Sequence, residues 1–448
     1  MRRVRVIAMP TRFPLPQPSE QSPTSATRLT APGSAWRAAP FLAALLLALA
    51  ACGDNGSEPD PGARPTSITI TPQSATLTYV GATARFTARI TDQNGDSYPG
   101  TVTWSASDPA IFTVAADGEV TATGGGTGTL TASFEDISAT ASVNVDQLPF
   151  ALVAFLGDGQ DGAAGETLAD PLVVRAEDAA GAPVMGLLVT FEAAAGDGSA
   201  DPVTDTTLSD GTAWSWWTLG DGSGVHLLTA SLEDGISTEF SAAVGPLDPP
   251  SETATYRIDF TATWSSTTHP NSFPGGAHWS PLIGAVHSSR ASFWEMGETS
   301  SPGMESMAET GATGTLTSEI DDQIPGNALS VVNGTGSGSP GSVRIRDVVV
   351  RLDHPHVTLV SMIAPSPDWF AGVTGLTLLN GVGQWADVRR VVLFPLDAGT
   401  DDGTSYTAGN ANTSPKQPIR SLRGINPFSS APVATLTFTR TDEPGGGG

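Results

Sequence analysis

Residues 86–95 read Phe-Thr-Ala-Arg-Ile-Thr-Asp-Gln-Asn-Gly, and this stretch indicates the fold class. Apolar Phe86, Ala88 and Ile90 alternate with polar residues, which is the period of a half-buried β-strand. Asn94-Gly95 then supplies a tight turn. Similar short alternating stretches follow along the chain, separated by turn pairs such as Asp117-Gly118. Short strands with turn signals every 8–12 residues or so are typical of β-sandwiches. The sequence therefore predicts an all-β protein.

The composition limits the number of domains and the possible partners. A chain of 448 residues has room for about three domains. It contains 50 glycines and 35 prolines, which is too turn-rich for a helical protein. The formal net charge of -25 repels phosphate backbones, so we expect no nucleic-acid partner, whereas it suits a secreted surface or divalent cations. With one cysteine, the chain forms no internal disulfide framework and no cysteine-based zinc site.

An apolar run near the start of the chain predicts export. The run Phe41 to Ala51 is too short to span a bilayer and is typical of the central region of a secretory signal. Leu49-Ala50-Ala51-Cys52 resembles a bacterial lipobox, which implies cleavage before Cys52 and lipid attachment to its thiol. Gly53 after the cysteine favours sorting to the outer membrane in such lipoproteins.

These features divide the N-terminal part of the chain. Residues 1–51 are predicted to be a lipoprotein signal with an upstream extension. Residues 52–65 are rich in Gly, Asp and Pro and are predicted to form a flexible tether. We expect an outer-membrane lipoprotein exposed at the bacterial cell surface, although the sequence leaves open whether the chain faces the medium or the periplasm.

Two segments resemble bacterial immunoglobulin-like domains. Residues 66–147, with Val102-Thr-Trp104-Ser and a Gly128-Thr-Leu130-Thr strand, resemble group 2 of these domains. Residues 148–246, with Leu188-Val-Thr-Phe191 and Ser209-Asp210-Gly211-Thr, resemble the invasin/intimin-type group 1. Both resemblances imply rigid spacers. In Trp214-Ser-Trp216-Trp217, strand alternation predicts that one or two rings are buried and one is at the surface, with an exposed sugar-binding platform as the alternative.

The C-terminal part has a different and distinctive sequence. It includes Tyr256-Arg-Ile-Asp-Phe260, His278-Trp279-Ser280-Pro281, Pro365-Ser-Pro367-Asp368-Trp369 and Asp397-Ala-Gly-Thr-Asp401. Together these motifs resemble the spondin N-terminal domain. The resemblance implies a third β-sandwich over residues 250–441, followed by a flexible tail at 442–448. The expected architecture is thus three consecutive β-sandwich domains.

Acidic residues in this C-terminal segment suggest a cation site. Two prolines restrict the backbone before Asp368, and glycines 399 and 403 allow the loop that holds Asp397 and Asp401 to curl. Converging carboxylates repel one another unless a hard cation lies between them, and calcium takes 6–8 oxygen ligands with loose geometry. The resemblance to spondin domains implies that Asp368, Asp397 and Asp401 bind calcium, with a peripheral role for Asp402. The alternative is a solvated acidic loop without an ion.

An enzyme is the rival interpretation. His269, His278 and His287 are nine residues apart, which matches no helical face, and no H-E-x-x-H pair exists. Four carboxylates, predicted to lie along one side of a short helix, could in principle supply a glycosidase acid and base: Glu295, Glu298, Glu305 and Glu309.

We expect instead a calcium-binding adhesion lipoprotein that is not an enzyme. Its partners would be the membrane, through lipid on Cys52, and an extracellular protein or glycan. The remaining alternatives are a surface-displayed enzyme, such as a polysaccharide hydrolase, and a purely structural spacer.

Overall fold

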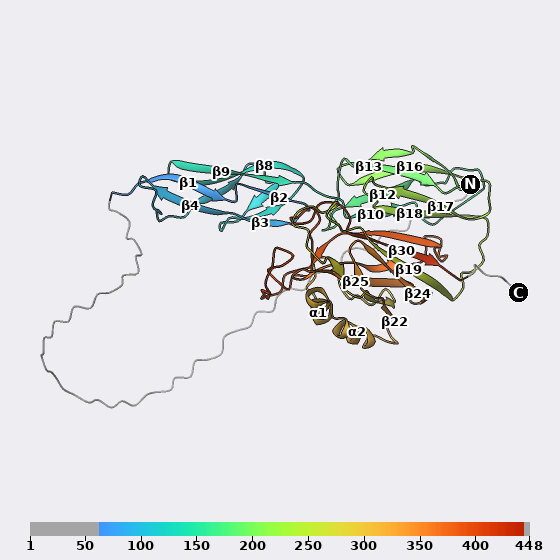
Figure 1. Ribbon diagram of the computed structural model, residues 1–448. Helices are drawn as coiled ribbons and strands as arrows, with labels where there is room; N and C mark the ends of the chain where they lie inside the picture. Colours follow the sequence, from blue (N-terminus) through green and yellow to red (C-terminus); the bar gives the residue numbers. More distant parts are fainter. Residues whose placement is uncertain (1–61, 443–448) are drawn as a thin grey trace, which may run out of the picture. The chain divides into compact units, whose positions relative to one another are not determined.

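The computed structural model describes residues 62–442, which fold into three consecutive β-sandwiches (Figure 1). This confirms the predicted fold class. The predicted signal, the lipidation residue Cys52 and most of the tether lie outside the described residues. Within residues 62–442, no helix combines the length and hydropathy needed to cross a membrane.

The first sandwich contains nine short strands around one apolar core. The strands are β1 (Pro65–Thr71), β2 (Ser74–Leu77), β3 (Thr83–Arg85), β4 (Thr87–Asp92), β5 (Thr103–Ala106), β6 (Phe112–Val114), β7 (Glu119–Ala122), β8 (Gly126–Phe134) and β9 (Ile137–Val145). They form sheets in the orders β1-β4, β2-β9-β8-β5 and β3-β7-β6. Phe86 and Ile90 from the alternating stretch are buried in the core with Phe112 and Leu130. The apolar residues of the alternating stretch therefore face the core, as the sequence predicts.

The second sandwich packs two larger sheets face to face. Its strands are β10 (Ala151–Leu156), β11 (Gln160–Gly162), β12 (Leu172–Glu177), β13 (Leu188–Ala193), β14 (Gly198–Asp201), β15 (Thr204–Thr206), β16 (Thr212–Leu219), β17 (Gly224–Ser231) and β18 (Ser237–Val244). The sheet orders are β10-β12-β16-β14 and β11-β18-β17-β13-β15.

The tryptophans of β16 differ from the prediction. Trp217 is fully buried, but Trp214 and Trp216 are 43% and 39% exposed. The prediction that at least one ring is buried holds for Trp217, but two rings rather than one lie at the surface, because positions 214 and 216 share the outward face of β16 while 217 faces the core.

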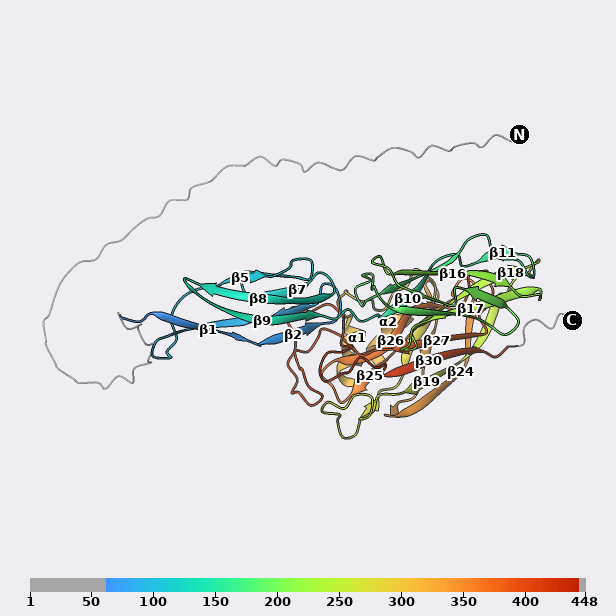
Figure 2. The same ribbon diagram turned by 90° about the horizontal axis from the view of Figure 1, so that it is seen from above.

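The C-terminal domain has two sheets and a helical layer. Its strands are β19 (Thr253–Ala262), β20 (His278–Trp279), β21 (Ile283–His287), β22 (Ala328–Asn333), β23 (Ser337–Gly338), β24 (Gly341–Arg351), β25 (His356–Ala364), β26 (Trp369–Thr377), β27 (Val388–Leu393), β28 (Leu396–Asp397), β29 (Arg420–Ser421) and β30 (Ala434–Arg440). One sheet has the order β24-β19-β30-β27, and Figure 2 shows these strands side by side. The other runs β22-β21-β25-β26-β28-β29, with β20 paired to β25 and β23 paired to β20. Buried aromatic and aliphatic residues, including Tyr256, Phe260 and Trp369, form the core of this domain.

Two short helices pack against the second of these sheets: α1 (Pro302–Thr310) and α2 (Gly314–Asp321). The start of α1 is specified locally, because Ser301 accepts a hydrogen bond from the Met304 N–H and Pro302 occupies the first turn. Gly311 ends the helix in the left-handed conformation. Met304 and Met307 are buried in a core cluster shared with the sheet.

The prediction that one short helix carries all four glutamates is wrong, because the helix in the structure is shorter and begins later. Only Glu305 and Glu309 lie on α1, whereas Glu295 and Glu298 precede it in turns. The N-cap serine fixes the first helical residue after both of those positions, so the four carboxylates do not share a helical face.

The second sandwich and the C-terminal domain share packing. Phe394, directly after β27, belongs to the apolar core of the second sandwich, where it lies near Phe150. Arg423 is buried, donates to the Pro149 carbonyl, and pairs with Asp234 at 2.6 Å. The Arg423 guanidinium also stacks over the Phe394 ring at 3.9 Å.

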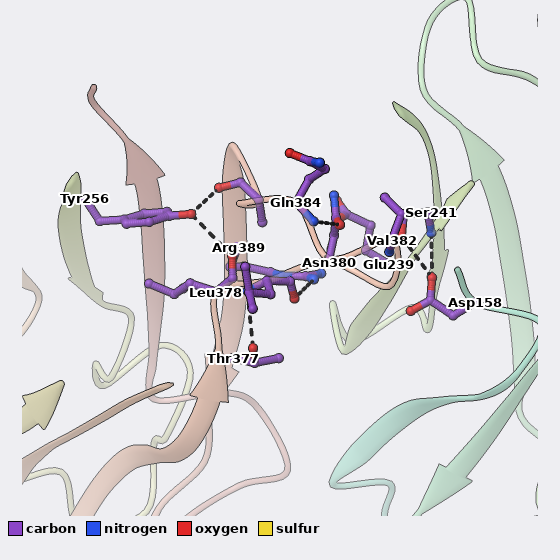
Figure 3. A network of polar contacts seen from close by, with 12 residues as sticks. Asp158, Glu239, Ser241, Tyr256, Thr377, Leu378, Asn380, Val382, Gln384 and Arg389 are labelled. Atoms are coloured by element: carbon purple, nitrogen blue, oxygen red, sulfur yellow. Dashed lines mark hydrogen bonds and ion pairs between the residues drawn. The ribbon is translucent and has the colours of Figure 1, made fainter. Parts of the chain in front are cut away.

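A polar network joins the same two domains at another place (Figure 3). Arg389 Nη1 lies 3.1 Å from Glu239 Oε1, and the Val382 N–H donates to Ser241 Oγ at 3.2 Å. Asp158 in turn accepts hydrogen bonds from the N–H and hydroxyl of Ser241. The C-terminal domain is therefore fastened to its neighbour by apolar, ionic and hydrogen-bonded contacts.

Candidate calcium site

Asp368 lies between β25 and β26, at the end of the proline-containing loop, and is fully buried. Its Oδ2 accepts hydrogen bonds from the Thr400 N–H at 2.8 Å, the Thr400 hydroxyl at 3.3 Å and the Asp401 N–H at 3.2 Å. Its Oδ1 has no hydrogen-bond partner. A buried carboxylate oxygen without a partner is costly, so this atom is the part of the site that most needs a ligand.

Asp397 lies beside this loop because β28 pairs with β26 and places Asp397 opposite Trp369. The Asp397 side chain is buried. Its Oδ1 accepts from the Gly399 N–H at 2.9 Å, and its Oδ2 accepts from Arg420 Nη2 at 2.9 Å. Asp397 therefore has a cationic partner.

Asp401 is held by its own loop. Its Oδ1 accepts from the Gly403 N–H at 2.7 Å and its Oδ2 from the Ala411 N–H at 2.8 Å. Thus both carboxylate oxygens of Asp401 already have local donors. Its backbone N–H, rather than its side chain, makes the direct contact with Asp368.

The predicted glycines shape this loop. Gly399 has φ of 73°, a conformation that favours glycine, and a Cβ at this position would lie 2.1 Å from the Gln417 carbonyl oxygen. At Gly403, a Cβ would lie 2.6 Å from Cγ of Pro367. Both positions therefore exclude a side chain, and the loop folds closely against the segment that contains Asp368.

The electrostatics of Asp368 differ from those of an ordinary carboxylate. Burial, followed by the charge of nearby Asp397, raises the pKa of Asp368 to about 7. Burial lowers the pKa of Arg420, but the charge of Asp397 and its hydrogen bond to the guanidinium, together with weaker nearby charges, raise it above its usual value. The site as a whole has one carboxylate with a cationic partner and one without.

This arrangement fits a hard cation in part. Asp368 and Asp397 are close enough to repel each other, and Asp368 Oδ1 is unused, which is the donor chemistry that calcium prefers. Across residues 62–442, however, no three His, Cys, Asp or Glu side chains are grouped to hold a metal. For all three aspartates to bind one ion, Asp401 would have to turn from the N–H groups of Gly403 and Ala411. Calcium at this place therefore stays a prediction.

Sequence reasoning missed two neighbours of this site. Thr400 donates twice to Asp368. Burial raises the pKa of Glu309 on α1, and the nearby charges of Glu305 and Asp401 act in the same direction. Glu309 Oε1 is also buried without a hydrogen-bond partner. The Ser301-Pro302 start and the Gly311 end of α1 were the available signals for placing Glu309 on a helix beside this loop.

Asp402 and the three evenly spaced histidines lie in other environments. Asp402 is exposed and accepts from the Thr413 hydroxyl at 2.7 Å. His269 is buried and accepts from the Ser429 N–H, while His287 contacts the Thr358 hydroxyl at 2.8 Å. His278 is exposed. Burial lowers the pKa of His269 and of His287, and the three rings share no partner. Their contacts are those of framework residues.

Comparison with known proteins confirms two of the resemblances. The family model Spondin_N matches residues 254–433, and the bacterial Ig-like domain (group 2) matches residues 65–145. The C-terminal segment is thus a spondin N-terminal domain and the first sandwich is a group 2 bacterial Ig-like domain. The group 1 assignment of residues 148–246 stays a prediction.

Several similar proteins are spondins. Spondin-2 of Rattus norvegicus is 34% identical over 210 residues, which is 42% of this chain and 62% of the relative. Spondin-1 of Gallus gallus is 35% identical over 211 residues, which is 44% of this chain and 26% of the relative. The chain thus spans about three fifths of Spondin-2 and about a quarter of Spondin-1.

Among solved structures, the adhesin InvE of Yersinia pseudotuberculosis is similar. The identity is 18%, the coverage is 47% of this chain and 70% of that chain, and the TM-score is 0.25. At this score the likeness supports no conclusion about function.

Proposed function

With a spondin N-terminal domain over residues 254–433 as the premise, we propose that this protein is a cell-surface binding module whose C-terminal domain binds calcium. The observation that carries the proposal is Asp368, which is fully buried beside Asp397 and has one oxygen without a partner. Asp368 and Asp397 would hold the ion, with Asp401 as the third ligand. Backbone carbonyls and water would complete the coordination shell.

The role of the ion in this proposal is structural. Calcium would neutralise the repulsion between two buried carboxylates and join the 365–368 loop to the 397–403 loop. An ion that binds only the folded state stabilises it by RT ln(1 + [L]/Kd). Because Asp368 follows β25 and Asp397 lies in β28, the ion would fix one end of the second sheet.

The remaining parts of the proposal concern display and ligand. We propose that lipid on Cys52 anchors the chain in the outer membrane and that the two preceding sandwiches extend the spondin domain away from it. The ligand would be an extracellular protein or glycan. Support for an adhesion role comes from the combination of a spondin domain with a bacterial Ig-like domain. No group of residues in 62–442 favours an enzyme over this function.

Thermal unfolding of the full chain with calcium, with magnesium and with chelator tests the metal. A rise in melting temperature with calcium and a much smaller one with magnesium would support the proposal. Identical melting in all three conditions would refute the metal site. Binding to a panel of extracellular proteins and glycans, with and without calcium, then tests the adhesion role; a chain that binds nothing on such a panel would argue for a structural spacer.

A further inference from the structure

The outer face of the sheet β24-β19-β30-β27 is unusually basic. In β19, Tyr256, Ile258 and Phe260 are buried, so the residues between them, Arg257 and Asp259, point away from the core. The same alternation places exposed arginines on the neighbouring strands. We call the following set the arginine face: Arg257, Arg344, Arg346 and Arg390.

Strand register places these four arginines in two adjacent rows. Arg344 lies opposite Asp259, Asp259 opposite Thr437, and Thr437 opposite Arg390, so one row crosses all four strands. In the next row, Arg257 lies opposite Thr439.

Arg346 extends this second row on the edge strand. The register of β24 shifts because Tyr256 lies opposite Val348 and Ile258 opposite Ile345, so Arg346 and Asp347 together lie across from Arg257. Four guanidinium groups therefore lie on one face, across strands that are spaced about 4.8 Å apart.

The Asp259 carboxylate orients two of these arginines but leaves most of their guanidinium N–H groups available. Asp259 accepts from Arg257 Nε at 2.6 Å and from Arg344 Nε at 2.5 Å. These hydrogen bonds outweigh the effect of burial and lower the pKa of Asp259. Since Asp259 contacts only the Nε atoms, most terminal nitrogens of the two guanidinium groups remain available for another anion.

The other two arginines have no partner within the described part of the chain. Arg346 and Arg390 are exposed and make no hydrogen bond or ion pair there. This is notable in a chain with 46 acidic and 21 basic residues, where most surface arginines could find a carboxylate.

Nearby carboxylates leave the face net positive. Glu239 pairs with Arg389, Asp353 with Arg351, and Asp442 with Arg440. Two exposed carboxylates beside the arginine face have no such partner in the described residues: Asp347, in the shifted segment of β24, and Asp387, directly before β27. Four arginines thus face three carboxylates, Asp259, Asp347 and Asp387.

We propose that the arginine face binds an anionic polysaccharide that carries carboxylate or sulfate groups. From Arg344 to Arg390 the row spans three strand spacings, or about 14 Å, which is too wide for a single small anion and suits repeated charges along a polymer. The hydroxyls of Thr437 and Thr439 lie between the arginines and can bond sugar hydroxyls. The inference rests on the proposed extracellular function and narrows its ligand class.

Binding of the full chain carrying Cys52→Ser to polygalacturonate and to dextran sulfate, with neutral dextran as the reference polymer, tests this inference. Arg346→Ala/Arg390→Ala should lower the affinity for the acidic polymers at least tenfold and reduce its dependence on salt. The matched control is Arg89→Ala/Arg290→Ala, which removes the same charge from two exposed arginines outside this sheet and should bind as the parent does. Arg346→Lys/Arg390→Lys should recover part of the affinity.

Three outcomes would overturn the inference. These are no binding of the parent to the acidic polymers, equal loss in the two alanine double variants, and tighter binding to anionic vesicles or single-stranded DNA than to polysaccharide. Chelator should leave polysaccharide binding unchanged, because the arginine face shares no residue with the aspartate site. A protein that binds the polymers but does not respond to calcium would therefore contradict only the proposed metal site, and the reverse result only the arginine face.

Discussion

Asp368 and Asp397 lie next to each other on paired segments, yet only Asp397 has a cationic partner, Arg420 Nη2 at 2.9 Å. The Asp368 side chain is fully buried and lies near the charge of Asp397 with hydrogen bonds but no cationic partner. This asymmetry makes Asp368 the residue on which the metal proposal can be tested most sharply.

Asp368→Asn should separate stability from the calcium response. The amide keeps an oxygen for the N–H groups of Thr400 and Asp401 and removes the buried charge. In chelator we therefore expect the variant to be at least as stable as the parent. At calcium 100-fold above its Kd, the parent should gain about 2.7 kcal/mol and the variant almost nothing. Urea unfolding in both conditions measures this, with Asp402→Asn as the control that should keep the response. A parent that loses stability on adding calcium would contradict the prediction.

The pH dependence of the metal-free protein should show the raised pKa of Asp368. Its folded pKa of about 7 lies above 3.8, the usual value of an aspartate, so the folded state holds a proton that the unfolded state releases. The resulting stabilisation is present below about pH 4 and is lost as the pH rises to about 7. The free energy of unfolding of the parent minus that of Asp368→Asn should therefore fall between pH 4.5 and pH 7.5 in chelator. A flat difference over this interval would mean that Asp368 titrates normally.

Calcium binding should release protons near neutral pH. At pH 6.5 a large fraction of Asp368 is protonated in the metal-free protein, and a bound cation requires the carboxylate. Calorimetric titrations in buffers with different ionisation enthalpies should show a net release of up to about one proton per ion. At pH 8.5 the release should disappear. Binding heats that are the same in every buffer at pH 6.5 would count against Asp368 as a ligand.

Arg423→Met should weaken the junction between the second sandwich and the spondin domain. Asp234 would lose its charge partner, and the Pro149 carbonyl would lose its donor. Breaking a buried ion pair on one side typically costs about 3 kcal/mol or more. Thermal unfolding should shift downward and separate into two transitions. Arg85→Met, which removes one member of an exposed ion pair in the first sandwich, is the control and should leave the profile unchanged.

Cys52→Ser should release the protein from membranes. With the thiol absent no lipid can be attached, and the chain offers no second cysteine for it. Cell fractionation should move the protein from the detergent-soluble membrane fraction to the soluble fraction, and mass spectrometry of the parent should find acyl chains at residue 52. Unchanged membrane association of the variant would mean that the lipobox resemblance is misleading.

The sandwich architecture was predictable because its signal is local. Alternation in stretches such as 86–90 and 256–260 places apolar side chains on one face of a strand, and the structure buries those residues. The ends of α1 were also encoded locally, in Ser301 and Gly311, but nearby glutamates at helix-like intervals suggested a longer helix.

The details of the aspartate site were less predictable, because backbone N–H groups and a cation compete for the same carboxylate oxygens. The four-residue spacing of Asp397 and Asp401 suggested carboxylates that converge. In the structure, the N–H groups of Gly403 and Ala411 lie nearer to Asp401 and bind its oxygens. Short acidic side chains readily bond to nearby backbone groups, and spacing alone does not reveal which donor is favoured.

Contacts between domains left no signal in the sequence. Phe394 follows a strand of the spondin domain, and nothing in its neighbours indicates that it packs in the core of the second sandwich. The arginine face is similar, because Arg257, Arg344 and Arg390 come from distant segments and meet only through strand register.

Arg423 forms an ion pair with Asp234 and stacks on Phe394, and we call these two contacts the Arg423 clasp. The clasp affects how the protein would respond to a pulling force. If a bound ligand and a membrane anchor pull the chain from opposite sides, the load enters the spondin domain across this lateral contact before it reaches the linker at residues 247–252. The short linker would then be relieved of tension until the clasp yields. A pulling experiment should therefore show two separate rupture events, the first when the clasp breaks and the second when the second sandwich unfolds.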